Sequence, residues 1–156
     1  MRRKRKIKRE IEPDFKYNNT LVAKFTNHLM KDGKKSTAQR VLYGAFDIVE
    51  KKAKGKDALE IFDQAVKNAS PSVEVKSRRI GGARYQVPRE VRGERKVTLA
   101  MRWIIQAARA KKGKSMAQRL AEELLEASQN TGRAVGKKQD THKIADANKA
   151  FARFAW

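Results

Sequence analysis

Phosphate binding is the chemistry that one short motif suggests. The run DGKKS at residues 32–36 places two lysines in a glycine turn just before a predicted helix. A Walker-type nucleotide loop would need a glycine five residues before the Gly-Lys pair and a Ser or Thr directly after the lysine. His28 and Lys35 occupy those positions, so the motif is not a nucleotide loop. Lysines at a helix N-terminus favour contact with a phosphate of a nucleic-acid backbone. The alternative is that these lysines belong to an ordinary turn exposed to solvent.

Acid–base and metal chemistry have no comparable set of residues. Glu122, Glu123 and Glu126 form the one dense acidic group, and they share a predicted amphipathic helix. A catalytic carboxylate pair needs partners that converge in a pocket, so a solvated face or a contact with a basic protein explains this group better. His28 and His142 lie far apart in sequence and lack the spacing of metal ligands. The sequence predicts neither an enzyme nor a metal or cofactor site.

Positive charge is the dominant signal of the composition. The 156 residues include 38 Lys and Arg against 17 Asp and Glu, a formal net charge of +21. Such a surplus repels itself unless a polyanion neutralises it, and nucleic acid is the usual polyanion. The seven cations of residues 2–9 supply only part of the surplus, because the rest of the chain still carries +14. We therefore expect the folded body itself to dock on nucleic acid.

The cations form clusters that are separate in sequence, at residues 2–9, 33–35, 76–95, 109–114 and 137–138. Within them Arg95, Arg102 and Arg109 repeat every seven residues and share one face of a predicted helix. A surface that meets phosphates from several sides explains this distribution better than a single solvated face. The predicted phosphate contacts are Arg2, Arg3, Lys4, Arg5, Lys6, Lys8, Arg9, Lys34, Lys35, Lys76, Arg78, Arg79, Arg95, Arg102, Arg109, Lys111, Lys112 and Lys114.

The spacing of apolar residues predicts a mainly α-helical fold. Stripes at helical spacing predict about six helices, and Gly136 leaves the start of the last one open. Between the third and fourth helices the period changes to two around Gly81-Gly82, which is a hairpin signal. We expect a single domain, residues 1–156: a helical bundle with a protruding two-stranded β-hairpin arm at about residues 72–90. Residues 1–19 are predicted to form a basic N-terminal arm.

The glycine pair also sets the register of the hairpin. Pairing Ile80 with Ala83 makes Arg78 face Tyr85. Neither face is mainly apolar, and an isolated two-stranded ribbon is marginal in water. We therefore expect an arm that projects from the body and is steadied by its ligand. Tyr85 has two open interpretations, stacking on an unpaired base or packing across the strand on the Arg78 stem.

The composition also excludes several classes of protein. The chain has no cysteine, so it has neither a disulfide nor a cysteine-based metal site. No apolar run approaches the ~20 residues of a membrane span. No apolar segment follows the basic N-terminus, as a secretory signal would require. A soluble protein of a reducing compartment is the expectation, with no membrane partner.

Three segments of the sequence are distinctive: DGKK at residues 32–35 with Val41-Leu42 after it, VKSRRIGGA at residues 75–83 leading to YQVP, and AMRW at residues 100–103. Together they closely resemble the seventh small-subunit ribosomal protein family. The hairpin run is the specific one, and the resemblance covers essentially the whole chain, with a length similar to the bacterial form. It implies a helical bundle with a protruding ribbon, as the periodicity predicts independently.

The resemblance also implies a structural constituent of the ribosome, located in the cytoplasm. Members of the family bind the 3′ major domain of 16S ribosomal RNA, nucleate assembly of the head of the small (30S) subunit, and contact the ninth and eleventh small-subunit proteins. Carried onto matching positions, Lys34, Lys35, Lys76, Arg78 and Arg79 become ribosomal-RNA contacts. The ribbon lies near exit-site (E-site) transfer RNA and the messenger RNA path, and the residues nearest to them become Arg78, Arg79, Gly81, Gly82, Arg84 and Tyr85.

Two other interpretations are weighed against this one. A generic DNA- or RNA-binding protein of the nucleoid type would use the basic β-arm to enter a groove. Equal affinity for any duplex DNA and for the RNA would favour it. A basic enzyme acting on nucleic acid would need a carboxylate–metal or nucleophile–base set, which the sequence lacks.

Overall fold

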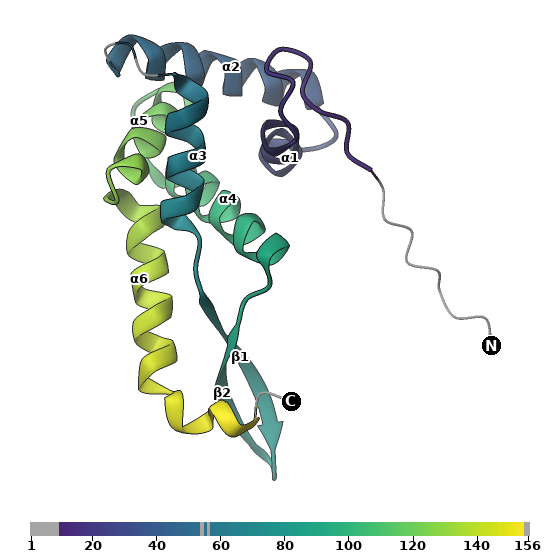
Figure 1. Ribbon diagram of the computed structural model, residues 1–156, viewed down its shortest axis with the longest axis vertical. Coiled ribbons are helices and arrows are strands. Elements are labelled where there is room, and N and C mark those ends of the chain that lie inside the picture. Colours follow the sequence, from purple (N-terminus) through teal and green to yellow (C-terminus); the bar gives the residue numbers. More distant parts are fainter. Residues whose placement is uncertain (1–9, 54, 56, 155–156) are drawn as a thin grey trace, which may run out of the picture.

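The computed structural model describes residues 10–53, 55 and 57–154, which form six α-helices, one hairpin and a 3-10 helix (Figure 1). The expectation of a mainly helical fold with a two-stranded hairpin is confirmed. The predicted arm contacts at residues 2–9, and Trp156, lie outside the described residues. In chain order the elements are α1 (Thr20–Leu29), α2 (Lys35–Lys52), α3 (Ala58–Ala69), β1 (Val73–Ile80), β2 (Ala83–Glu90), α4 (Gly93–Ala110), α5 (Met116–Ser128), α6 (Gly132–Ala147) and η1 (Lys149–Phe154).

Side-chain caps explain where two of the helices begin. Asp57 accepts the backbone N–H of Leu59 at 3.0 Å at the start of α3. Ser115 and Gln118 form a reciprocal capping box at the start of α5, as their spacing predicts. The start of α2 is different, because the helix begins at Lys35 and no side chain caps it. The N–H of Lys35 donates to the carbonyl of Gly33 at 2.9 Å, so the uncapped N–H groups of the first turn are those of Ser36 and Thr37.

One apolar core holds the helices together, and α5 lies at its centre against α2, α3, α4 and α6. Phe25, Phe46 and Phe62 are fully buried, and the rings of Phe25 and Phe62 meet edge-on with centroids 5.3 Å apart. On α4, Met101, Ile104 and Ile105 are buried in this core, while Val97 and Trp103 are only partly buried against it. The core thus fixes α4, the helix that continues from the ribbon.

Part of the predicted N-terminal arm packs on the body. Asp14 is buried and accepts the hydroxyl proton of Tyr43, 2.9 Å from its Oδ2. The ring of Tyr17 packs edge-on against Phe46 at 5.1 Å. Residues 14–19 therefore belong to the surface of α2, although the charge pattern placed them in the arm.

The hairpin has the register that its glycine turn predicts. Ile80 pairs with Ala83 and Arg78 with Tyr85, and Gly81 and Gly82 have φ angles of 55° and 90°. Positive φ at both central positions is what this turn requires and what glycine permits without strain. The predicted pairing is confirmed.

One face of the ribbon is covered by the C-terminal segment, which corrects the expectation of a ribbon steadied only by its ligand. The helix α6 leaves the body and runs beside the ribbon, and η1 crosses β2 at its end (Figure 1). Val87 is 2% exposed, and the ring of Tyr85 lies 5.1 Å from that of Phe151 and 6.3 Å from that of Phe154. Tyr85, which is paired with Arg78 across the strands, therefore also packs on aromatic rings of η1, a contact that the sequence analysis did not predict.

Two hydrogen bonds attach α6 to the end of α3 and to the segment that leads into the ribbon. Lys138 donates to the carbonyl of Asn68 at 2.8 Å, and the backbone N–H of Ser72 donates to the ring of His142 at 3.2 Å. The last helix begins at Gly132, continues through Gly136 and ends at Ala147. Phe151 and Phe154, whose spacing from Ile144 and Ala147 predicts that they continue this helix, lie instead on η1.

Candidate nucleic-acid interface

Two predicted cation clusters that lie about 75 residues apart in sequence meet at one hollow of the structure. The hollow has a volume of about 440 Å³ and lies between the end of α1, the start of α2, the end of α4 and the start of α5. We call it the basic hollow. Its lining residues are Leu29, Lys31, Lys34, Thr37, Ala38, Val41, Arg109, Met116 and Arg119.

The lining of the basic hollow combines cations with an apolar floor. Lys31, Lys34 and Arg109 are exposed, and Arg109 is fixed by a hydrogen bond of 3.1 Å to the carbonyl of Leu29. The uncapped N-terminus of α2 adds partial positive charge. A phosphate with a flat apolar group beside it, as in a nucleotide, suits this combination.

Lys31 and Arg119 are members of the hollow that the sequence analysis did not single out. Arg119 donates to the carbonyl of Lys111 at 2.6 Å and so caps the end of α4. Arg119 lies one helical turn after Ser115, the predicted cap of α5. This position could have suggested that its side chain reaches back to the basic turn at residues 109–114. Lys31 directly precedes the turn at Asp32, which has a φ of 51°.

The ribbon presents a second cationic surface on the face that α6 and η1 do not cover. Arg79 and Arg84 are directly opposite each other on the two strands, and both are exposed. Ser77 and Gln86 follow on the same face. We call these four residues the open face of the ribbon. Arg78 lies on the other face, half-buried beside Tyr85.

Arg95, a predicted phosphate contact, forms an ion pair at the root of the ribbon. Its guanidinium lies 3.1 Å from Glu74 Oε2, and Arg89 Nε donates to Glu74 Oε1 at 2.8 Å. Burial opposes ionisation of Glu74, but the two guanidinium groups outweigh it and hold the pKa of this carboxyl below its ordinary value. Arg95 therefore ties the start of α4 to β1, and Arg89 ties β2 to the same carboxylate.

Lys111 is likewise engaged inside the protein. Its Nζ lies 3.0 Å from Glu123 Oε2 and 2.9 Å from Glu126 Oε2, and its side chain is only 17% exposed. Burial alone would lower the pKa of Lys111, yet the hydrogen bonds and charges of the two carboxylates raise it above its ordinary value. Within the same basic turn, Lys114 pairs with Glu122, whereas Lys112 is exposed.

The acidic group of α5 corrects the expectation of a solvated face or a contact surface. Glu123 is fully buried, and its Oε1 accepts the backbone N–H of Ala134 at 2.9 Å in the first turn of α6. The contacts of Lys111, Glu123 and Glu126 join the end of α4, the middle of α5 and the start of α6. We call these three residues the carboxylate node.

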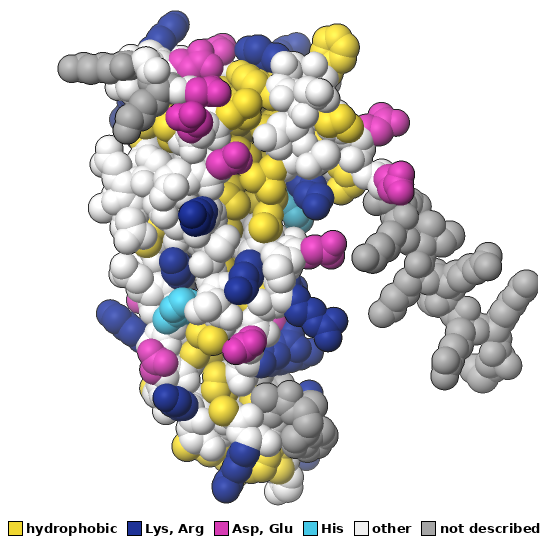
Figure 2. Space-filling view, in the orientation of Figure 1, with side chains coloured by type: hydrophobic (Ala, Val, Ile, Leu, Met, Phe, Trp, Pro, Cys, Tyr) yellow, Lys and Arg dark blue, Asp and Glu magenta, His cyan; other side chains and the backbone are white. Residues whose placement is uncertain are grey.

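The surface charges are unevenly distributed over the molecule. Figure 2 shows Asp and Glu side chains gathered over the C-terminal end of α2 and the start of α3, with Lys and Arg side chains prominent around the ribbon. No set of three His, Asp or Glu residues in the described part of the chain is placed to hold a metal ion. No helix within residues 10–53, 55 and 57–154 is long and apolar enough to cross a membrane.

Comparison with known proteins agrees with the cationic geometry. A family model described as Ribosomal protein S7p/S5e matches residues 1–149. The small ribosomal subunit protein uS7 of Thermotoga maritima is 56% identical over 156 residues, which is 100% of both chains. The uS7 proteins of Francisella tularensis subsp. holarctica and Dehalococcoides mccartyi are 57% and 56% identical over 155 residues, 99% of each chain.

The chain belongs to the S7p/S5e family of ribosomal proteins. The resemblance in the hairpin and the Gly-Lys-Lys turn therefore identified the family correctly. The family match ends at residue 149, so Phe151 and Phe154, which pack on Tyr85, lie beyond it. The full-length relatives nevertheless include this segment.

The predicted contacts of this S7p/S5e protein fall into two groups. Lys34, Lys35, Lys76, Arg79 and Arg84 are exposed, as are Arg102, Arg109 and Lys112. Arg95, Lys111 and Lys114 are exposed to different extents but form ion pairs with carboxylates of the same chain. The basic hollow and the open face of the ribbon therefore draw most of their charge from the first group.

Proposed function

We propose that this chain is a structural, non-enzymatic constituent of the small ribosomal subunit that binds ribosomal RNA. The observation that carries the proposal is the presence of two cationic surfaces linked by α4. The basic hollow lies at the C-terminal end of α4, and the ribbon joins its N-terminal end. An 18-residue helix is about 27 Å long, so only a large polyanion contacts both surfaces at once. The relatives named above are small-subunit ribosomal proteins.

The finer assignment follows from the resemblance. It places the binding site in the 3′ major domain of 16S ribosomal RNA and gives the protein the role of nucleating the head of the 30S subunit in the cytoplasm. It places the ribbon near E-site transfer RNA and the messenger RNA exit path, and it names the ninth and eleventh small-subunit proteins as neighbours. A ribbon that extends away from the helical body and exposes Arg79 and Arg84 at its tip supports this placement.

The test is binding of the purified chain to the 3′ major domain RNA, to unrelated RNA of equal length and to duplex DNA, at two salt concentrations. Phosphate contacts lower log K by roughly 0.7–0.9 per contact and per decade of salt for any nucleic acid. A preference for the 3′ domain of two or more orders of magnitude that persists at the higher salt is the expected result. Equal affinities that fall together with salt would favour the nucleoid-type alternative.

A charge reversal in the basic hollow tests the site itself. The variant Lys31→Glu with Lys34→Glu removes two exposed cations that no described carboxylate pairs with. We expect weaker binding to the 3′ domain and a smaller salt slope, with unchanged thermal unfolding. Lys51→Glu, an exposed charge at the other end of α2, is the matched control and is expected to bind almost normally. Equal losses in both variants would argue against a specific role for the hollow.

A further inference from the structure

The basic hollow has an apolar floor, which phosphate contacts alone do not explain. Val41 of α2 and Met116 of α5 line the hollow and pack against the core, and both side chains remain partly exposed. Leu29 and Ala38 line it as well and are buried. Apolar surface therefore faces the hollow, and covering it with a ligand is favourable because water is released from it.

The rim of the basic hollow has charge of one sign. Its cations are Lys31, Lys34, Arg109 and Arg119. In the described part of the chain no Asp or Glu lines the hollow, and no carboxylate forms an ion pair with any of these four. Arg109 and Arg119 donate to backbone carbonyls, which orients the guanidinium groups without neutralising them. The uncapped N–H groups of Ser36 and Thr37 add partial positive charge.

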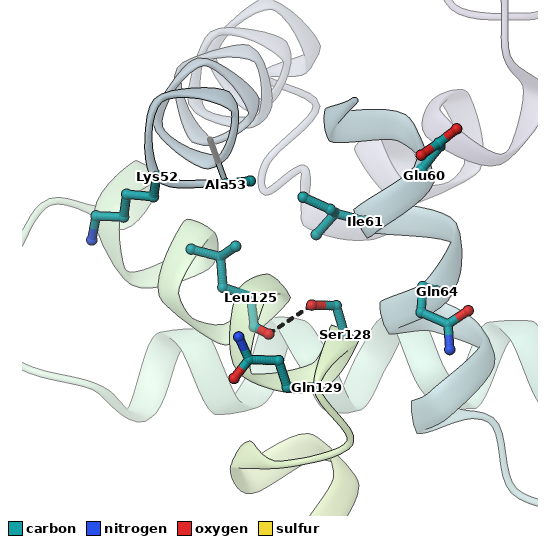
Figure 3. A pocket seen from close by; sticks show the side chains of 8 residues that line it. All are labelled: Lys52, Ala53, Glu60, Ile61, Gln64, Leu125, Ser128 and Gln129. Carbon is teal, nitrogen blue, oxygen red and sulfur yellow. Dashed lines mark hydrogen bonds between the residues drawn. The ribbon is translucent and has the colours of Figure 1, made fainter. Parts of the chain in front are cut away.

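A larger hollow, of about 640 Å³, lies between the C-terminal end of α2, α3 and α5 and lacks this combination (Figure 3). Ala53, Ile61 and Leu125 converge in its centre. Among the described residues its lining has one cation, Lys52, and one carboxylate, Glu60, on opposite sides. Its charges therefore balance and select no occupant, whereas those of the basic hollow select an anion.

The apolar floor and the cationic rim together restrict the occupant of the basic hollow. A free phosphate would use the rim and leave the floor uncovered. An apolar side chain of a protein would cover the floor and leave four cations without a counter-charge. The bases of an RNA duplex are stacked inside the helix, so a duplex also would reach only the rim. An unpaired nucleotide joins a phosphate to a flat base and meets both surfaces at once.

We propose that the basic hollow is a pocket for a single unpaired nucleotide of the RNA. The base lies against Val41 and Met116 on the floor. The phosphate lies near Lys34, Arg109 and the first turn of α2. The proposal rests on the proposed function, because it takes the nucleotide from the RNA that the chain binds. The chain then recognises an interruption in RNA pairing through a base, in addition to the charge of the backbone.

Photocrosslinking from a single cysteine locates the nucleotide. Because the chain has no cysteine, Ser36→Cys creates a unique site for an azidophenacyl group, and Ser36 is exposed beside the hollow without lining it. Lys51→Cys, in the last turn of α2, is the matched control. We expect position 36 to crosslink to one short stretch of the 3′ major domain RNA that contains an unpaired base, and position 51 not to reach it. Crosslinks from position 36 only to paired nucleotides, or none, would overturn the proposal.

Removing the base alone tests its contribution to binding. An abasic ribose replaces the unpaired nucleotide that crosslinks to position 36, which keeps its phosphate and the length of the RNA. We expect the affinity of the original chain to fall by about tenfold, as for the loss of one stacked base, with an unchanged salt slope because the phosphate contacts remain. The control is the same replacement at an unpaired nucleotide that does not crosslink. Equal affinities for the two RNAs would overturn the proposal.

A change of the floor tests the same contact from the side of the protein. Val41→Thr with Met116→Gln makes the floor polar and leaves the cations in place. Ile48→Thr with Leu125→Gln is the matched control, because these side chains are also partly buried on α2 and α5 but lie outside the basic hollow. We expect similar melting temperatures for the two double variants. Only the floor variant should lose affinity for the 3′ domain RNA, by about tenfold and with an unchanged salt slope.

The outcomes also separate this inference from the proposed function. If the original chain does not prefer the 3′ domain RNA, the proposed function fails and this inference fails with it. If the preference is present but the floor variant binds as tightly as its control, only the nucleotide pocket is overturned.

Discussion

The basic turn at residues 109–114 and the ribbon are alike in sequence but differ in how their cations are used. In the turn, Lys111 and Lys114 pair with carboxylates of α5, and Lys111 is largely buried. On the open face of the ribbon, Arg79 and Arg84 are exposed and opposite each other. Lys111 and Lys114 thus serve contacts inside the protein, whereas Arg79 and Arg84 are open to a ligand.

This difference shows that a cluster of Lys and Arg is not by itself a phosphate-binding site. A cation counts toward RNA binding only when no carboxylate of the same chain neutralises it. The root of the ribbon illustrates the rule within one element, because Arg89 and Arg95 pair with Glu74 there while Arg79 and Arg84 remain open at the tip.

The largest expected effect comes from breaking the carboxylate node. Lys111→Met leaves Glu123 buried without its cation, and removing one partner of a buried ion pair costs about 3–5 kcal/mol. We expect the free energy of unfolding, measured by urea titration, to fall by an amount in this range. In the double variant with Glu123→Gln, the amide oxygen still accepts the N–H of Ala134 and no charge is stranded, so most of the stability should return.

The same variants decide whether Lys111 also contacts RNA. If its role is internal, the salt slope of RNA binding of the double variant equals that of the original chain. A slope smaller by roughly 0.7–0.9, with unchanged stability of Lys111→Met, would show instead that Lys111 neutralises a phosphate.

A smaller loss of stability is expected from Gly132→Ala, at the start of α6. Gly132 has a φ of 87°, and an added Cβ would lie 3.0 Å from Glu126 Cβ and 3.2 Å from Glu123 Oε1. The strained backbone costs about 1–3 kcal/mol. Gly136→Ala is the control, since Gly136 lies inside α6 with nothing within 4 Å, and alanine there should be neutral or stabilising. Equal melting temperatures for the two variants would contradict this account of the node.

On the ribbon the expected effect is on binding and not on folding. Arg79→Glu with Arg84→Glu should lower affinity for the 3′ domain RNA and reduce the salt slope by roughly 0.7–0.9 for each lost phosphate contact. Stability should stay within about 0.5 kcal/mol, because both side chains are exposed. A loss of stability with unchanged affinity for RNA would show instead that Arg79 and Arg84 stabilise the fold and do not bind the ligand.

The smallest effect is the pH dependence of the ribbon root. Because Arg89 and Arg95 hold the pKa of Glu74 below 4.5, its contribution to stability is fully present above that pH. It is lost as the pH falls through the lower, folded-state value. Amide hydrogen exchange in β1 and β2 should therefore speed up in the original chain below about pH 4, relative to Glu74→Gln. If the exchange rates of the original chain and of Glu74→Gln change with pH in the same way, this ion pair does not stabilise the root of the ribbon.

Local signals in the sequence predicted the hairpin and several helix ends. The Gly81-Gly82 pair was enough for the register, because the turn admits one close pairing. Asp57 and Ser115 were recognisable as caps from their spacing alone. These features depend on residues within a few positions of each other, so the sequence carries them directly.

Features that depend on distant contacts were not predicted. The basic hollow arises because packing brings residues 29–41 against residues 109–119, which no local pattern specifies. The covering of Tyr85 depends on α6 ending at Ala147, so that Phe151 and Phe154 turn onto β2. Glu123 could have been suspected, since it lies three residues after the buried Leu120 and beside the buried Leu124 on the apolar face of α5.

The continuous helix α4 makes the protein sensitive to changes in length at one place and tolerant at others. One residue inserted into an α-helix rotates everything beyond it by about 100° and shifts it by about 1.5 Å. An insertion within Gly93–Ala110 would change the orientation of the ribbon relative to the basic hollow. The two surfaces could then no longer contact the same RNA at the same time. An insertion at Gly81-Gly82 would only lengthen the tip. The number of residues in α4 therefore sets both the distance and the relative orientation of the two RNA-binding surfaces.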